Sequence, residues 1–210
     1  MGYVLYGDIG SGSAVVEMAL AEAGETAEWR DVPLEGDHQL RPEYLAVNPM
    51  GRMPTLVLPD GTVMTESLAI LVALAERHPV LLPPPASAER AWALRWMTLA
   101  AAEFYPHVTR ADYPERFGPD PAAIRARAVE MGREVWRVVE AHAGLQGAGP
   151  EPFLLGATFS VADIYLAVLS RWMGGRQWVP ANLPRLEALA RAVAGRPALA
   201  PLWQRHRLAA

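Results

Sequence analysis

The chain of 210 residues contains neither cysteine nor lysine. The absence of cysteine excludes disulfide bonds, thiolate metal sites, a Cys-x-x-Cys redox pair and a cysteine nucleophile. The absence of lysine means that all 19 basic residues are arginine, which by itself indicates no function. Acidic residues number 23 and the net charge is -4, so the composition argues against a nucleic-acid-binding protein, which would need a basic face.

Long apolar runs are also missing. The longest, Leu68–Ala75, is far shorter than the roughly 20 residues that a membrane span requires. No basic segment followed by an apolar stretch opens the chain, so we expect no secretory signal, no membrane partner and a cytoplasmic location. No histidine pair or carboxylate cluster has the spacing of metal ligands, and no phosphate-binding or dinucleotide fingerprint is present, so we expect no metal.

Composition changes along the chain predict two domains. Residues 1–78 alternate strands and helices in the order β-α-β-(α)-β-β-α, which predicts a small mixed sheet with one parallel pair. Prolines crowd residues 79–87 and predict a stiff linker, and residues 88–210 show only helical spacing. The expected strands are 3–6, 27–32, 55–58 and 62–64, and the expected helices are 14–23, 44–46, 68–77, 88–105, 121–143, 160–172, 183–194 and 198–207.

The most informative stretch runs from Asn48 to Ser67. Asp60-Gly61 between two short apolar runs predicts a tight hairpin, because glycine adopts positive φ without steric cost. Ser67 is placed to open the helix that follows. Pro54 begins the first strand of the hairpin, and its peptide bond can be trans or cis; a cis bond would turn the backbone of Met53 outward, where an extended peptide could pair with it.

Together these features resemble the cytosolic glutathione transferase family, of the serine type or similar to the bacterial beta type. The resemblance rests on N-P-x-G-x-x-P-x-L at 48–56, the Asp-Gly hairpin, Glu66-Ser67, and F-L-x-G-x-x-F-S-x-A-D-I at 153–164. It implies a thioredoxin-like α/β N-terminal domain followed by an all-α C-terminal domain. In the second string, Ser160 and Asp163 have the spacing of a helix capping box, and the role of this string in the family is structural.

The resemblance implies glutathione as co-substrate and assigns residues to its parts. The cysteinyl backbone would pair with Met53 before a cis Pro54, Glu66 would bind the γ-glutamyl ammonium, and Ser67 its carboxylate. The glycyl carboxylate needs a cation or donor. Arg52 is nearest, with His38, Gln39 and Arg41 as rivals among which the sequence does not choose.

The glutathione thiol must be ionised near neutral pH, although a free thiol has a pKa near 8.5. Gly10-Ser11-Gly12-Ser13 opens a helix, and its N–H groups together with a hydroxyl donor can stabilise a thiolate. Ser11 matches the active hydroxyl of serine-type enzymes, and Tyr6 matches the tyrosine of the tyrosine-type enzymes. Gly12 stands where the beta-type enzymes carry cysteine, which excludes a mixed disulfide at that position and leaves the subclass open.

The second substrate should be a small apolar electrophile bound between the domains. Candidate lining residues are Tyr105, His107, Arg110 and Tyr113, each of which could equally be core or surface. We therefore expect a homodimeric detoxifying transferase of alkyl or aryl groups. Rivals are a glutathione-dependent isomerase of the maleylacetoacetate type, a disulfide reductase or peroxidase using the same thiolate, and a non-catalytic interaction module with this fold.

Overall fold

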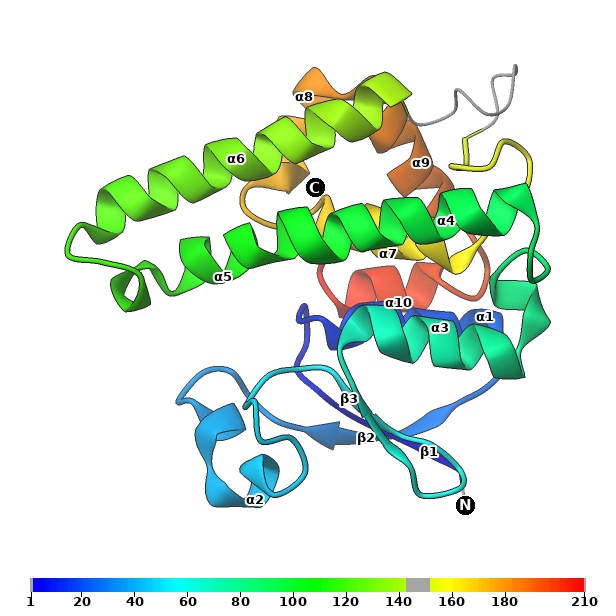
Figure 1. The fold of residues 1–210 in the computed structure, drawn as a ribbon, viewed down its shortest axis with the longest axis horizontal. Coiled ribbons are helices and arrows are strands. Elements are labelled where there is room, and N and C mark those ends of the chain that lie inside the picture. Colours follow the sequence, from blue (N-terminus) through cyan, green and yellow to red (C-terminus); the bar gives the residue numbers. More distant parts are fainter. Residues whose placement is uncertain (1, 143–151, 210) are drawn as a thin grey trace. The chain divides into compact units, whose positions relative to one another are not determined.

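The computed structural model describes residues 2–142 and 152–209, and these residues form two compact units (Figure 1). The first unit runs to Leu81 and also takes in Gly195–Leu208, whereas the second is built from Leu82–Ala194. The sequence analysis assigned the last helix to the helical domain, and the structure differs on this point. Two glutamates of the first helix are ion-paired with arginines of the final segment, which explains why that segment belongs to the first unit.

A mixed four-stranded sheet forms the centre of the first unit, with strand order β2-β1-β3-β4. The inner strand β1 is parallel to β2 and antiparallel to β3, and β3 is antiparallel to β4. The parallel pair follows from the helical crossover between β1 and β2, and the antiparallel pair from the Asp60-Gly61 turn. The strands are β1 (Tyr3–Gly7), β2 (Ala27–Asp31), β3 (Thr55–Val57) and β4 (Val63–Thr65).

Helices α1 (Ser13–Glu22) and α3 (Ser67–Arg77) pack together on one face of this sheet, and α10 (Ala200–Arg205) lies beside α1 (Figure 1). The short helix α2 (Pro42–Leu45) lies on the other side. The apolar face of α1 is completely buried, as is Leu5 of β1. The order of elements and the mixed sheet confirm the expected thioredoxin-like domain.

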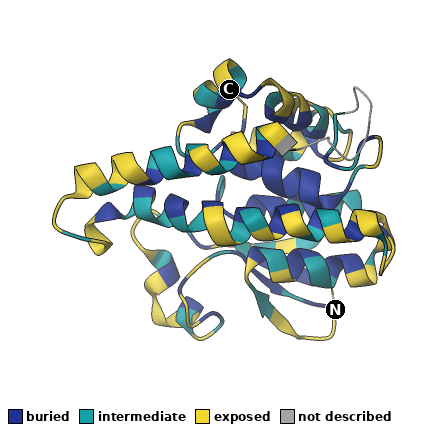
Figure 2. Ribbon diagram, turned by 45° about the horizontal axis from the view of Figure 1, so that its top comes forward, coloured by how far each residue is buried: buried dark blue, intermediate teal, exposed yellow. Residues whose placement is uncertain are grey.

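All the regular elements that the structure describes in the second unit are helices. Its centre is α7 (Val161–Leu169), which is buried along its whole length (Figure 2). The carboxylate of Asp163 accepts hydrogen bonds from the backbone N–H groups of Leu154, at 2.8 Å, and Ser160, at 2.7 Å, and thereby closes the expected capping box. The other helices are α4 (Ala88–Leu99), α5 (Tyr105–Asp112), α6 (Pro121–His142), α8 (Gly175–Asn182) and α9 (Pro184–Ala194).

The first long helix of this unit does not end at Tyr105, as the sequence predicts. It continues through a π-helical turn at Ala100–Phe104 into α5, where Pro106 occupies the first turn. The N–H of Tyr105 bonds to the carbonyl of Ala100, five residues earlier. Proline lacks an N–H and crowds the carbonyl four residues before it, so the wider turn lets the helix pass this residue. The expected helix 121–143 forms as α6, and its last expected residue, Ala143, lies outside the described residues.

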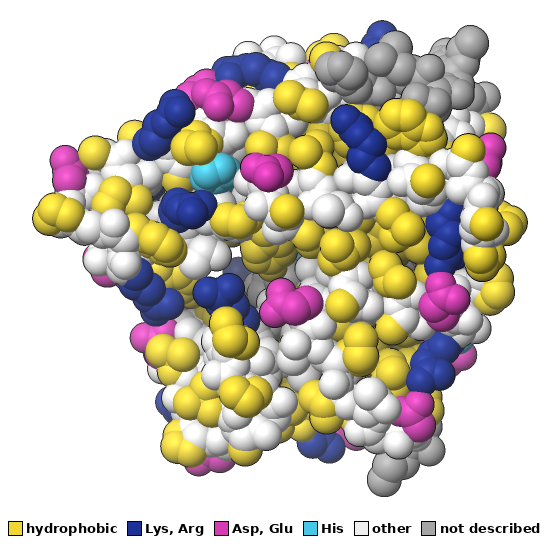
Figure 3. All heavy atoms as spheres, viewed as in Figure 1, with side chains coloured by type: hydrophobic (Ala, Val, Ile, Leu, Met, Phe, Trp, Pro, Cys, Tyr) yellow, Lys and Arg dark blue, Asp and Glu magenta, His cyan; other side chains and the backbone are white. Residues whose placement is uncertain are grey.

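Charged side chains of both signs are interspersed on the face of the molecule drawn in Figure 3. Within the described ranges, none of the helices is both long and apolar enough to cross a bilayer. The same ranges contain no group of three or more histidine, aspartate or glutamate side chains arranged to hold a metal ion.

Candidate active site

Most of the residues that the sequence analysis assigned to glutathione lie at one end of the sheet. Tyr6 of β1 pairs with Thr55 of β3, and Thr55 pairs with Thr65 of β4. The carboxyl ends of β1, β2 and β4 and the amino end of β3 therefore lie at the same end of the sheet. The chain places four of its connections there: the loop carrying Ser11, the turn carrying Gln39, the stretch Arg52–Pro54 and the start of α3 at Glu66-Ser67.

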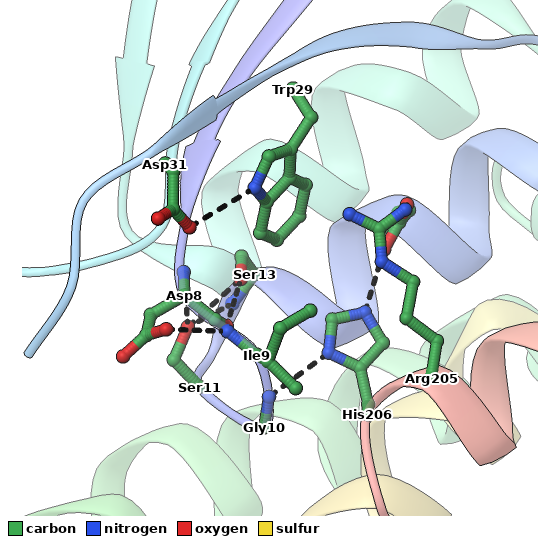
Figure 4. Close-up of polar contacts among 10 residues, drawn as sticks. Asp8, Ile9, Gly10, Ser11, Ser13, Trp29, Asp31, Arg205 and His206 are labelled. Carbon is green, nitrogen blue, oxygen red and sulfur yellow. Dashed lines mark hydrogen bonds and ion pairs between the residues drawn. The ribbon is translucent and has the colours of Figure 1, made fainter.

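The loop between β1 and α1 is held by its own hydroxyl groups (Figure 4). The Oγ atoms of Ser11 and Ser13 lie 2.8 Å apart, and the Ser13 hydroxyl donates to the carbonyl of Asp8 at 3.0 Å. A hydroxyl has a single proton, so Ser11 must be the donor in the contact between the two serines. The Ser11 oxygen accepts from the N–H groups of Asp8 and Ser13, each at 3.3 Å, and the side chain is 9% exposed. Ser11 thus stands at the mouth of α1 with its proton turned to Ser13.

Tyr6 lies on the opposite face of the sheet from Ser11. Its strand neighbour Gly7 faces α1, since a Cβ at Gly7 would collide with the side chain of Ser13. Adjacent residues of a strand point to opposite faces, so Tyr6 points away from α1. Its ring packs against that of Tyr44, with 5.9 Å between centroids, and its hydroxyl accepts a hydrogen bond from Nη1 of Arg30 at 2.8 Å. The structure therefore does not bring the two thiol-activating candidates together.

The peptide before Met53 is anchored from two sides. The carbonyl of Arg52 accepts hydrogen bonds from the Tyr44 hydroxyl at 2.6 Å and from Nδ2 of Asn48 at 2.7 Å. Burial raises the pKa of the Tyr44 hydroxyl, which keeps it protonated as a donor. The Met53-Pro54 bond is cis, as the family resemblance implies. In the part of the chain that the structure describes, neither the N–H nor the carbonyl of Met53 has a hydrogen-bond partner.

Gln39 and Arg52 lie close to one another in the fold. The ideal Cβ position of Gly51 lies 3.1 Å from the carbonyl oxygen of Gln39, which brings the turn at His38–Leu40 against the stretch before β3. The Gln39 side chain is 3% exposed; its Nε2 donates to Asp37 at 2.8 Å, and its Oε1 has no partner among the described residues. The Arg52 side chain is exposed and forms no ion pair with any described residue. Of the two residues, Arg52 is therefore the one that is both charged and exposed.

Glu66 is the residue with the most unusual backbone at this end of the sheet. It caps α3 with φ 63° and ψ 109°, outside the regions that residues other than glycine normally occupy. Its side chain is exposed and no described residue pairs with its carboxylate. Such backbone strain costs about 1–3 kcal/mol and concentrates at functional sites. Ser67 follows as the first residue of α3 and is 8% exposed. An acidic side chain thereby stands in solvent beside the positive end of a helix.

The four residues assigned to the second substrate all lie in the second unit, on α5 or at its end. The Tyr105 ring meets Trp172 edge to face, with 5.5 Å between centroids, and Arg110 stacks on Phe117 at 5.6 Å. His107 is 7% exposed; burial, with a smaller effect of Arg110, lowers the pKa of its imidazole. Tyr113 packs under the guanidinium of Arg116, 4.1 Å from the ring centroid.

None of these four residues lines the hollow that the second unit contains. This hollow is small, with a volume of about 10 Å³, and Nε of Arg133 and Nε1 of Trp172, which have no partner among the described residues, are buried in its wall. Its lining residues are Phe104, Val129, Gly132, Arg133, Trp136, Trp172, Met173, Gly175 and Trp178.

Sequence reasoning missed several residues that shape the site. The Asp8 carboxylate ties its loop to the segment after β2 by accepting the N–H of Leu34 at 2.9 Å. Tyr44 fixes the Arg52 carbonyl, and His206 contacts Gly10 from the far end of the chain. An aspartate after a strand and before a glycine-rich turn is a usable signal for Asp8. No local pattern marks Tyr44 or His206, because their partners are distant in sequence.

The comparisons with known proteins agree with this geometry. Residues 13–77 match the family model of the glutathione S-transferase N-terminal domain. The chain is 30% identical over 206 residues to an uncharacterized GST-like protein, YncG, of Escherichia coli K12, covering 97% of this chain and 98% of that protein. It is 33% identical over 153 residues to the glutathione S-transferase GstA of Escherichia coli O157:H7, covering 70% and 69%.

Two further matches bear on the activity. A maleylacetoacetate isomerase of Dictyostelium discoideum is 38% identical over 94 residues, which cover 43% of this chain and 42% of that protein. Among solved structures, a glutathione transferase homologue from Sulfitobacter, crystallised with bound glutathione, superposes with a TM-score of 0.87 and 27% identity over 97% of both chains. Since relatives of 30% identity or more align over most of their length and the fold is the same, the chain belongs to the glutathione transferase family.

Proposed function

We propose that this chain is a glutathione transferase. In this proposal the thiol of glutathione is ionised at the mouth of α1, and the thiolate attacks an electrophilic carbon of a small apolar substrate. A carbon–sulfur bond forms, and the leaving group departs with the bonding electrons. As the family resemblance implies, the proposal includes a cytoplasmic homodimer and a role in detoxification.

One observation supports this proposal most strongly. Groups that are complementary to the three parts of glutathione come together at one end of the sheet. Met53 precedes β3, Glu66 follows β4 and the loop of Ser11 follows β1, and these strand ends are neighbours in the sheet. The unpaired backbone of Met53 can bond an extended peptide as an added strand. The exposed Glu66 carboxylate matches an ammonium, and the amino end of α3 matches a carboxylate.

The positive charge available for the glycyl end of glutathione favours this same orientation of the tripeptide. Arg52 is exposed, and the backbone of Gln39 approaches the same stretch. A guanidinium forms paired hydrogen bonds with a carboxylate, so Arg52 would bind the glycyl end. Gln39, whose side chain is buried and donates to Asp37, would support the turn beside Arg52. The thiol, in the middle residue, would then lie toward the loop of Ser11, where the N–H groups of a helix start favour negative charge.

Two measurements, made one after the other, test this function. Titration calorimetry with glutathione decides whether the chain binds it, and the reaction of glutathione with a chlorinated dinitrobenzene decides whether it transfers the thiol. Binding with turnover is the expected result. Binding without turnover would leave a glutathione-binding module, and absence of binding would reject the proposal.

A second candidate is a glutathione-dependent isomerase, favoured by the match to the maleylacetoacetate isomerase. In such a reaction the thiolate adds to a double bond and then leaves, so glutathione is regenerated. In a transfer, the sulfur stays in the product. Mass spectrometry of the products obtained with maleylacetoacetate and with the chlorinated arene separates the two activities.

A further inference from the structure

The end of the chain supplies an imidazole to the loop of Ser11. His206, which follows α10, is completely buried. Its Nδ1 atom accepts a hydrogen bond from the backbone N–H of Gly10, 3.0 Å away (Figure 4). Its Nε2 atom lies 2.6 Å from Oε2 of Glu17 on α1. The imidazole therefore bridges α1 and the loop that precedes this helix.

The hydrogen bonds determine which nitrogen of His206 carries the proton. Because Nδ1 accepts from an N–H group, it has no proton, so the neutral ring is protonated at Nε2 and donates to Glu17. The other charged group at this position is Arg205, whose Nη1 donates to Oε1 of Glu17 at 2.8 Å. From β2, the uncharged ring of Trp29 packs against the imidazole, with 6.0 Å between centroids. Glu17 thus orients the ring so that its lone pair faces Gly10.

Gly10 is suited to this contact by its backbone. Its φ of 79° lies in the left-handed region that favours glycine, and its ideal Cβ position is 3.4 Å from the carbonyl oxygen of His206. The next residue is Ser11. Hydrogen bonds attach the loop to its surroundings from Asp8 to Leu34 and Ser13, from Gly10 to His206, and from Ser11 to Ser13. Among the bonds that the structure describes for this loop, the one to His206 comes from the final segment, Gly195–Leu208.

The final segment has other attachments to α1 that do not involve the loop. Arg196 forms two hydrogen bonds with Glu22, at 2.6 and 2.8 Å, and Arg205 pairs with Glu17. These ion pairs join the segment to α1 independently of the bond between the imidazole and Gly10. His206 additionally provides a hydrogen-bond acceptor for the backbone N–H of Gly10 in the loop.

We propose that His206 is a positioning residue for thiol activation: by holding the N–H of Gly10, it keeps Ser11 and the start of α1 in place against the glutathione sulfur. The inference rests on the proposed function. Removal of the imidazole should raise the pKa of the bound glutathione thiol, while the ends of the tripeptide remain held by Met53, Glu66 and Arg52.

Two amide variants separate the contacts of the two ring nitrogens. In His206→Asn, the side-chain oxygen can take the place of Nδ1 and accept from Gly10, but the contact with Glu17 is lost. In His206→Gln, the amide reaches the place of Nε2 and can meet Glu17, but the acceptor for Gly10 is lost. His206→Ala removes both contacts. Arg196→Gln is the matched control, because it weakens the docking of the same segment without touching the loop.

The pH profile of kcat/KM and the ultraviolet absorbance of the bound thiolate provide the functional readout. For His206→Ala and His206→Gln we expect the thiol pKa to rise by about one unit, and kcat/KM below that pKa to fall about tenfold. KM for glutathione should stay within about threefold. His206→Asn and Arg196→Gln should keep the wild-type profile. Equal profiles for all four variants, or equal losses in the Asn and Gln variants, would overturn the proposal.

Amide hydrogen exchange provides a readout that needs no glutathione. The N–H of Gly10 should exchange at least about tenfold faster in His206→Ala and His206→Gln than in wild type. The N–H of Gly61, bonded to the carbonyl of Leu58 at 2.9 Å, should be unaffected. If the wild type binds no glutathione, the proposed function fails, and this exchange experiment still decides the role of His206 in holding the loop. Unchanged exchange at Gly10 would reject that role.

Discussion

The hydroxyl oxygens of Ser11 and Ser13 lie 2.8 Å apart, with Ser11 as the donor. The hydroxyl that is best placed to stabilise a thiolate therefore already has an acceptor inside the protein. Glutathione binding must turn the Ser11 proton away from Ser13 and toward the sulfur. A thiolate is a charged acceptor, and hydrogen bonds to charged groups are worth about 1.5–3 kcal/mol against about 1 kcal/mol for neutral ones, so the exchange is favourable.

Substitution of Ser11 tests this account most directly. We expect Ser11→Ala to lower kcat at least about tenfold and to change glutathione affinity only a few-fold, because the hydroxyl acts on the sulfur and not on the ends of the tripeptide. Tyr6→Phe is the matched control, since it also removes one hydroxyl near β1 but on the opposite face of the sheet. Steady-state kinetics of the three proteins would contradict the assignment if Tyr6→Phe were the slower variant.

Substitution of Ser13 should have a different effect. Ser13→Ala removes the internal acceptor and leaves the Ser11 proton free for the thiolate, so kcat should be preserved or increased. The same change deletes a buried hydrogen bond to Asp8, and the free energy of unfolding should fall by about 1 kcal/mol. Urea denaturation and kinetics on the same preparation measure both quantities. A tenfold loss of kcat in this variant would mean that Ser13 itself acts on the sulfur.

Glu66 should govern affinity, in contrast to Ser11. Glu66→Gln removes the charge that faces the γ-glutamyl ammonium and should weaken glutathione binding by about 2 kcal/mol, roughly thirtyfold in Kd. Glu25→Gln makes the same change at another exposed position of the first unit and should leave Kd unaltered. Calorimetric titration of both variants compares them, and equal affinities would exclude Glu66 from the site.

Arg52 can be tested with a shortened ligand. γ-Glutamylcysteine lacks the glycyl residue, so it should bind wild type and Arg52→Gln with the same affinity. Glutathione should bind the variant about tenfold more weakly than wild type, because a charge-assisted hydrogen bond is lost. If Arg52→Gln weakened both ligands equally, the guanidinium would not contact the glycyl carboxylate, and Arg41 would be the next residue to test.

The capping carboxylate of α7 makes stability depend on pH. Burial raises the pKa of Asp163 from 3.8 to about 6. A carboxyl with a raised pKa in the folded state binds more protons there than in the unfolded chain, so its contribution to stability is complete below about pH 4 and is lost as the pH rises through 6. Two units of pKa correspond to about 3 kcal/mol.

Asp163→Asn does not titrate and provides the reference for this prediction. Between pH 4 and 7, the free energy of unfolding of wild type should fall by about 3 kcal/mol more than that of the variant, as measured by urea denaturation at each pH. Parallel curves for the two proteins would mean that the carboxyl titrates in the folded state as it does in the unfolded chain.

Features that depend on neighbours in sequence were predictable, and the structure contains them. The Asp60-Gly61 turn, the cis bond before Pro54 and the capping box of Ser160 with Asp163 each follow from a few consecutive residues or from the family pattern built on them. The parallel pair of β1 and β2 followed in the same way, because a helical crossover joins these two strands.

Features that depend on distant residues were not predictable. β1 is apolar or aromatic at almost every position, so its sequence does not reveal that Tyr6 faces away from α1. The passage of the helix through Pro106 depends on a π-helical turn that periodicity does not signal. The contact between Gly10 and His206 spans 196 positions, and nothing near either residue marks the other.

The position of the last helix within the first unit has a consequence for synthesis of the protein. Domains generally fold as units while the ribosome is still elongating the chain, beginning with the N-terminal one. Here the first unit includes Gly195–Leu208, so its sheet and α1 emerge early but lack Arg196, Arg205 and His206 until the second unit, which lies between them in the chain, has been synthesised. The unit that begins to be synthesised first is therefore completed only after the described helices of the second unit have left the ribosome.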